Sequence, residues 1–125
     1  MTYARPPRPV SRSDWNPWDD IEALRHWLDE ANGTGQDELI LRILKVQEEA
    51  GEVAQAVIGM VGQNPRKGVT HTEQDVIGEL LDVAITAMVA VDTITQDPVL
   101  SRGLMAAKLG AIRARAKASV GERAS

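Results

Sequence analysis

Apolar residues recur along four segments of the chain with the three- to four-residue spacing of an α-helix. The sequence "NGTG" stops the first segment after residue 31, and "GQNPRKGVTH" separates the second from the third. Thr72 and Asp75 have the spacing of a capping box, and Asp97 followed by Pro98 is typical of a helix start. The pattern predicts helices over residues 17–31, 37–62, 72–95 and 98–119.

The predicted fold class is all-α, because the sequence contains no alternating strand pattern of useful length. Four helices with short connections are typical of a four-helix bundle. The chain has 125 residues, enough for one domain with its own core. We interpret residues 1–13, which contain arginines and prolines but no apolar run, as a flexible basic tail. Residues 120–125 are interpreted as a C-terminal tail.

The second predicted helix carries the sequence "EEAGE" at residues 48–52. Its three glutamates share one face of a helical wheel, and that face points away from the apolar stripe. The stripe consists of Leu39, Ile43, Val46, Ala50, Val53, Ala54, Val57 and Val61. Taken alone, this pattern is typical of a charged face in water, with Lys45 and Glu49 as an ion pair one turn apart.

The third predicted helix favours a different interpretation of the acids. Residues 76–91 contain only two charges, Glu79 and Asp82, within an otherwise almost wholly apolar surface. Such a helix must be covered on most sides, by its own bundle or by a second chain. Carboxylates on it then need a cation, because burying an unpaired charge is very unfavourable. The simplest cation is a divalent metal between the two helices, since bases are few there.

Helical spacing places Glu48, Glu49 and Glu52 opposite Glu79 and Asp82, an arrangement that can hold one metal ion or two. Oxygen ligands favour Mg²⁺, with Mn²⁺ as the alternative. A di-iron site requires histidine three residues after a glutamate. The two histidines of the chain, His26 and His71, are not in that register.

Charge is distributed unevenly along the chain, although the net charge is only −4. Residues 14–97 hold 17 acids and 5 bases, and residues 98–125 hold 6 bases and 1 acid. A nucleic-acid groove needs a continuous basic face, so we expect no stable nucleic-acid binding. The basic C-terminal segment, residues 98–125, could contact the phosphates of a ligand or pack against the acidic part of the chain, residues 14–97. Lacking cysteine, a membrane span and a secretory signal, the chain is expected to be cytoplasmic.

The two acidic motifs, "EEAGE" and "ELLD" at residues 79–82, are separated by 26 residues and together read EExxE…ExxD. This combination resembles the MazG-like members of the all-α nucleoside triphosphate pyrophosphohydrolase superfamily, over about residues 37–95. The resemblance implies a MazG-like domain over residues 14–119, completed as a homodimer or homotetramer. It also implies that all five acids form the Mg²⁺ site. The implied reaction converts a nucleoside triphosphate to a monophosphate and pyrophosphate.

Glu49 or Glu52 is expected to orient or deprotonate the attacking water, as a carboxylate not fully used in metal binding. Thr86 stands where many relatives place asparagine or an aromatic residue, and Lys108 matches a C-terminal lysine of the family. Trp27 could stack on the base of a nucleotide or close the core of the domain. Arg66 and Lys67 could contact the triphosphate or be solvated charges of the loop. The expected substrate contacts are Lys45, Thr86, Trp27, Arg66, Lys67, Lys108 and Arg113.

Two other functions remain open at this point. A phosphoribosyl-ATP pyrophosphohydrolase shares the carboxylate arrangement. A non-catalytic helical protein that binds a nucleotide or a partner could retain the acids for structural reasons. The sequence does not determine the base, the sugar or the number of metal ions.

Overall fold

The computed structural model describes residues 14–124, so the predicted tail over residues 1–13 lies outside the described part of the chain. Within the described residues the fold is all-helical, with no strand, and it is consistent with a helical bundle. The four predicted helices are confirmed. The helices are α1 (Pro17–Asn32), α2 (Gln36–Val61), α3 (Glu73–Thr95) and α4 (Pro98–Ala124).

Local hydrogen bonds account for most of the helix ends. The Asn16 side chain accepts the backbone N–H of Trp18 at 3.1 Å and begins α1. The predicted capping box is present: the Asp75 N–H donates to Thr72 Oγ1, and the Thr72 N–H donates to Asp75 Oδ2. Gly62, with φ +67°, ends α2 in the left-handed conformation that glycine adopts without strain. Helix α4 continues past residue 119 to Ala124, because its alanines, arginines and lysines favour helix and no proline interrupts them.

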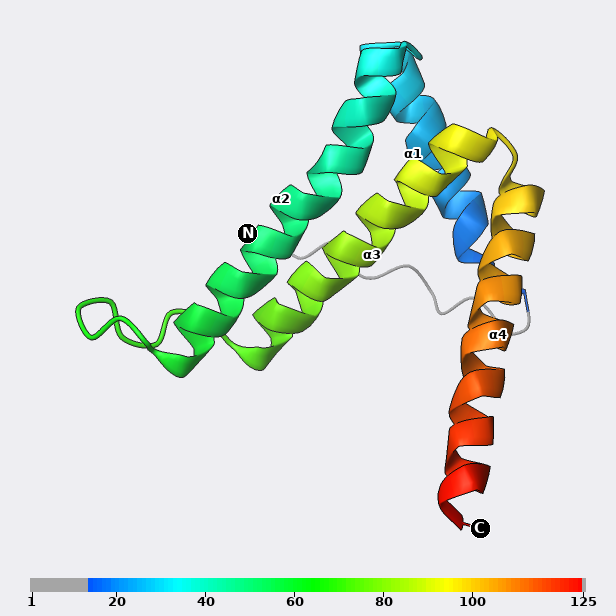
Figure 1. The fold of residues 1–125 in the computed structure, drawn as a ribbon. Helices are drawn as coiled ribbons and strands as arrows, with labels where there is room; N and C mark the ends of the chain where they lie inside the picture. Colours follow the sequence, from blue (N-terminus) through cyan, green and yellow to red (C-terminus); the bar gives the residue numbers. More distant parts are fainter. Residues whose placement is uncertain (1–13, 125) are drawn as a thin grey trace.

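Helices α2 and α3 lie antiparallel and side by side along their length (Figure 1). Helix α1 packs against the C-terminal half of α3, and α4 begins there and then diverges from the α2–α3 pair. The molecule is therefore bundled at one end and opens towards the other. From Arg102 to Arg123 every residue of α4 is exposed.

The apolar core lies where α1 meets α3. Trp18, Ile21 and Val89 are buried in it, and Leu28 and Met88 pack against them. Trp18 is thus the tryptophan that closes the core.

A network of ion pairs and hydrogen bonds joins all four helices beside this core. Asp92 is fully buried and accepts hydrogen bonds from Arg25 Nε at 2.7 Å and from Ser101 Oγ at 2.8 Å. Arg42 is also buried, and its Nη1 donates to Asp29 Oδ1 at 2.8 Å. Sequence reasoning missed this network. The available signal was Asp92, a single acid at the end of the apolar stretch of residues 83–91.

The packing face of α2 differs from the one that the apolar stripe indicates. Arg42, Ala56 and Gly59 are the buried residues of α2, whereas Ile43 is 46% exposed and Val61 is 63% exposed. Glu49 and Glu52 are half-buried on the same side of α2, so part of the acid-bearing face lies at the contact with α3. The main apolar stripe is therefore left largely uncovered within the chain.

Helices α3 and α4 also leave apolar side chains uncovered. Large exposed side chains on α3 and α4 include Ile77, Leu80, Leu81, Leu104, Leu109 and Ile112. Among residues 14–124, none of the helices combines the length and apolar character needed to cross a bilayer.

Candidate metal centre

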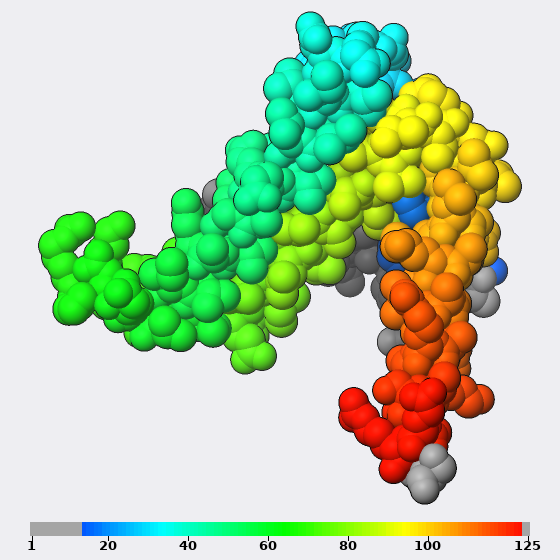
Figure 2. All heavy atoms as spheres, viewed as in Figure 1, coloured from blue at the N-terminus to red at the C-terminus, as the bar shows by residue number. Residues whose placement is uncertain are grey.

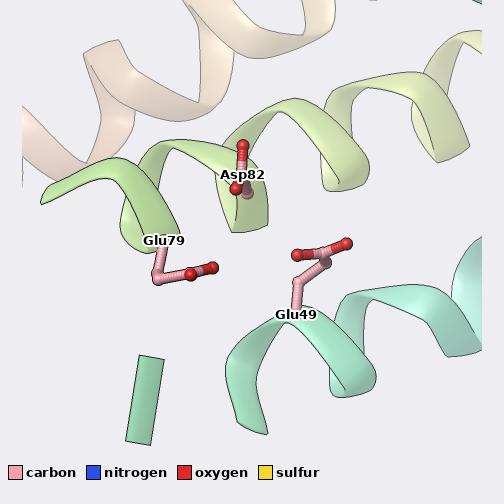
Figure 3. A group of neighbouring side chains, drawn as sticks. All are labelled: Glu49, Glu79 and Asp82. Carbon is pink, nitrogen blue, oxygen red and sulfur yellow. The ribbon is translucent and has the colours of Figure 1, made fainter. Parts of the chain in front are cut away.

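Three carboxylates converge between α2 and α3. Glu49 of α2 and Glu79 and Asp82 of α3 each offer an oxygen, and these oxygens lie within 4.8 Å of one another. Figure 3 shows the three side chains on facing turns of the two helices. The convergence follows from the packing face of α2, which brings Glu49 against the polar strip of α3. We call this group the carboxylate cluster.

The carboxylate cluster is partly removed from water. The Glu49 side chain is 13% exposed, Glu79 is half-buried and Asp82 is exposed. Glu79 Oε2 is buried and has no hydrogen-bond partner among the described residues. A buried carboxylate oxygen that lacks a donor is unfavourable, and nearby negative charges make it more so. These oxygen ligands fit a hard divalent cation such as Mg²⁺, which would satisfy this oxygen and neutralise the cluster.

Glu52 adjoins the carboxylate cluster without being one of its three converging members. It is half-buried one turn after Glu49. The negative charge of Glu49, followed by burial and the charge of Glu79, raises the pKa of Glu52 above its ordinary value of 4.5. Glu52 therefore lies near both Glu49 and Glu79, beside the carboxylate cluster.

The raised pKa of Glu52 predicts an effect of pH on the metal-free protein. A carboxyl group whose folded pKa exceeds its unfolded value stabilises the fold below about pH 4.5, and this contribution is lost as the pH rises through the folded pKa. Glu52→Gln should therefore melt close to wild type at pH 4 and at a higher temperature than wild type at pH 7. Thermal melting in a chelator measures the difference. The control is Glu30→Gln, an exposed glutamate of α1, and a similar gain in both variants would contradict the prediction.

Lys45 is the base nearest the carboxylate cluster. Its Nζ lies 3.4 Å from Glu49 Oε1 and 3.4 Å from Glu48 Oε2, so the predicted one-turn ion pair is confirmed. Hydrogen bonding to Glu49, and then to Glu48, raises the pKa of Lys45. The Glu48 side chain is 64% exposed and turned towards Lys45, outside the three converging carboxylates. Metal binding by Glu48 therefore remains a prediction.

A small cleft adjoins the carboxylate cluster on the side of Lys45. Its volume is about 90 Å³, and Lys45 and Thr86 line it together from α2 and α3. Arg42, Leu28, Ile85 and Val89 complete its walls. The structure thus brings two predicted substrate contacts together beside the acids. Sequence reasoning missed Arg42 and Leu28 as lining residues of this cleft, because they are brought to it by the packing of α1 against α2 and α3.

The remaining predicted substrate contacts are dispersed. Trp27 is 63% exposed on α1, and Arg66 and Lys67 lie on the loop between α2 and α3. Lys108 and Arg113 are exposed on the diverging part of α4, which lies away from the α2–α3 pair in Figure 1. Within a single chain these five residues are not gathered at the carboxylate cluster.

Comparisons of the chain with protein-family models, with curated proteins and with solved structures found no match.

Proposed function

We propose that this protein is a Mg²⁺-dependent, MazG-like nucleotide pyrophosphohydrolase that cleaves a nucleoside triphosphate to a monophosphate and pyrophosphate. The observation that carries the proposal is the carboxylate cluster. Three acids from two antiparallel helices converge within 4.8 Å, and one of their oxygens is buried without a partner. A charged face in water does not require such convergence, whereas a cation site does.

The proposed chemistry assigns a separate task to each part of the site. Glu49, Glu79 and Asp82 would hold Mg²⁺, whose contribution is to neutralise charge on the phosphate oxygens. Glu52 adjoins these residues but lies outside their close group, so its carboxylate remains available to orient or deprotonate the attacking water. Water adds across the bond between the α- and β-phosphates, and pyrophosphate leaves. Glu49 is the alternative for the role of Glu52.

The cleft beside Lys45 supports a position for the rest of the substrate. Leu28, Ile85 and Val89 give it an apolar wall against which the edge of a base or sugar could rest, although its volume is too small to enclose either. Lys45 lines the cleft and is paired with Glu49. Thr86 lines the same cleft one turn after Asp82. A nucleotide lying along α2 would then place its phosphates at the carboxylate cluster.

The uncovered apolar side chains of α2, α3 and α4 support assembly as a homodimer or a dimer of dimers. Apolar surface of this extent is unusual on a monomer and is removed from water by association. Assembly would also allow Lys108 and Arg113 to reach the substrate from a second copy. Light scattering should give a multiple of the 13.6 kDa chain mass, and a monomer would contradict this part of the proposal. We place the enzyme in the cytoplasm, with its nucleotide substrates.

The test of the function is a panel of nucleoside triphosphates, with phosphoribosyl-ATP included, incubated with protein and Mg²⁺. We expect monophosphate and pyrophosphate in equal amounts from at least one compound, and none in a chelator. Release of orthophosphate would contradict the cleavage position. A rise in melting temperature with nucleotide but without products would indicate a non-catalytic binder instead.

A further inference from the structure

A cavity of about 400 Å³ lies between the last turns of α2 and the loop of residues 62–72. In Figure 2 this loop stands out beyond the end of α2. The cavity is distinct from the cleft beside Lys45 and shares no residue with it. The polar residues and the glycine that matter to its chemistry are Gln55, Gly59, Asn64, Lys67, Thr70 and His71.

Backbone contacts hold the loop in a defined position over the cavity. The Thr70 N–H donates to the Gly59 carbonyl at 2.9 Å, and the Gly68 N–H donates to the Asn64 carbonyl at 2.9 Å. Gly59 is buried against His71, and a Cβ at this position would overlap the imidazole ring. Glycine is therefore required here, because the loop approaches the helix too closely for a side chain.

The charges around the cavity favour an anion. Lys67 lines it, and no carboxylate of residues 14–124 does. His71 Nδ1 lies 2.8 Å from Thr70 Oγ1, a contact that orients the ring and leaves Nε2 for a ligand. Asp75, an acid near His71, is itself engaged by the N–H and hydroxyl of Thr72. The Gly59 carbonyl, which would repel an anion, already accepts the Thr70 N–H.

The position of the cavity relates it to the carboxylate cluster. Gln55 and Gly59 follow Glu49 of the cluster by six and ten residues, and so lie about 9 and 15 Å further along the axis of α2. They follow Glu52, which adjoins the cluster, by three and seven residues. Seven residues are close to two turns, so Glu52 and Gly59 share a face. The cleft beside Lys45, the carboxylate cluster and the cavity therefore follow one another along α2.

We infer that this cavity binds pyrophosphate, both as the β- and γ-phosphates of the substrate and as the free product. The order along α2 matches the order of groups in a nucleoside triphosphate: base and sugar, then the scissile bond, then the terminal phosphates. Lys67, His71 Nε2 and the Gln55 and Asn64 amides supply donors to phosphate oxygens. The assignment of the product rests on the proposed function, but the capacity to bind inorganic pyrophosphate does not.

The experiment is a calorimetric titration of inorganic pyrophosphate, in Mg²⁺, into the full chain and two matched variants. Lys67→Ala should raise the dissociation constant about tenfold or more, because it removes a charge-assisted hydrogen bond. Lys117→Ala removes the same charge from an exposed lysine of α4 that does not line the cavity, and it should change the dissociation constant less than about twofold. Lys67→Arg should restore most of the binding.

No pyrophosphate binding by the wild type, or equal losses in Lys67→Ala and Lys117→Ala, would overturn the assignment. The outcome is separable from that of the proposed function. Binding that depends on Lys67 without turnover of any nucleotide would keep the cavity assignment and reject the enzyme. Turnover with a Michaelis constant and pyrophosphate affinity unaffected by Lys67→Ala would keep the enzyme and reject the cavity.

Discussion

Glu79→Gln should reduce nucleotide turnover by more than about 100-fold and remove the rise in melting temperature that Mg²⁺ causes. Glu79 belongs to the carboxylate cluster, and its Oε2 is buried without a partner. Glutamine keeps the shape of the side chain but replaces one oxygen with an amide nitrogen, which does not bind Mg²⁺. Activity assays and thermal melting with and without Mg²⁺ measure both effects.

The same substitution should leave the metal-free protein folded, with a melting temperature equal to or above that of wild type. Neutralising Glu79 relieves its repulsion with Glu49 and Glu52, and the new amide group can donate to either carboxylate. The matched control is Glu30→Gln, which removes an exposed charge of α1 and should leave both measurements unchanged. If metal-free Glu79→Gln unfolds, or if it retains full turnover, Glu79 is not a metal ligand.

Asp92→Ala should lower the free energy of unfolding by about 3–5 kcal/mol, because it leaves the buried guanidinium of Arg25 without its closest partner. Asp92 is fully buried and joins Arg25 of α1 to Ser101 of α4 through hydrogen bonds of 2.7 and 2.8 Å. A loss of this size is a large part of the stability of a small domain. Urea denaturation with linear extrapolation measures it.

Asp20→Ala is the control for this prediction. Asp20 is exposed on α1, and its carboxylate accepts a 3.3 Å hydrogen bond from the exposed Trp15. Its removal should cost less than about 1 kcal/mol. Equal losses in the two variants would mean that the buried ion pair does not hold α1, α3 and α4 together.

The helices could be predicted from the sequence because their ends depend on neighbouring residues. The capping box of Thr72 and Asp75 and the αL glycine at Gly62 act over a few positions, and both are readable in a single segment. The end of α4 is the one bound that differs by more than a residue, because no proline stops this segment of good helix formers.

The packing face of α2 could not be predicted in the same way. A helical wheel shows which residues share a face but not which face meets a neighbour. The apolar stripe overlaps the packing face only in part: Leu39, Val46 and Val53 are half-buried, and the rest of the stripe is exposed. Glu49 was correctly placed opposite Glu79 and Asp82, yet the wheel could not separate it from the exposed Glu48. The cavity beside the loop was missed for a similar reason, because it depends on the close contact between Gly59 and His71.

The most direct test of the central claim is a crystal structure of the protein grown with Mn²⁺ in place of Mg²⁺, with anomalous scattering used to locate the metal. We predict a metal peak bounded by carboxylate oxygens of Glu49, Glu79 and Asp82. Crystals in which these side chains turn into solvent, or pair with lysine and arginine with no metal between them, would contradict it.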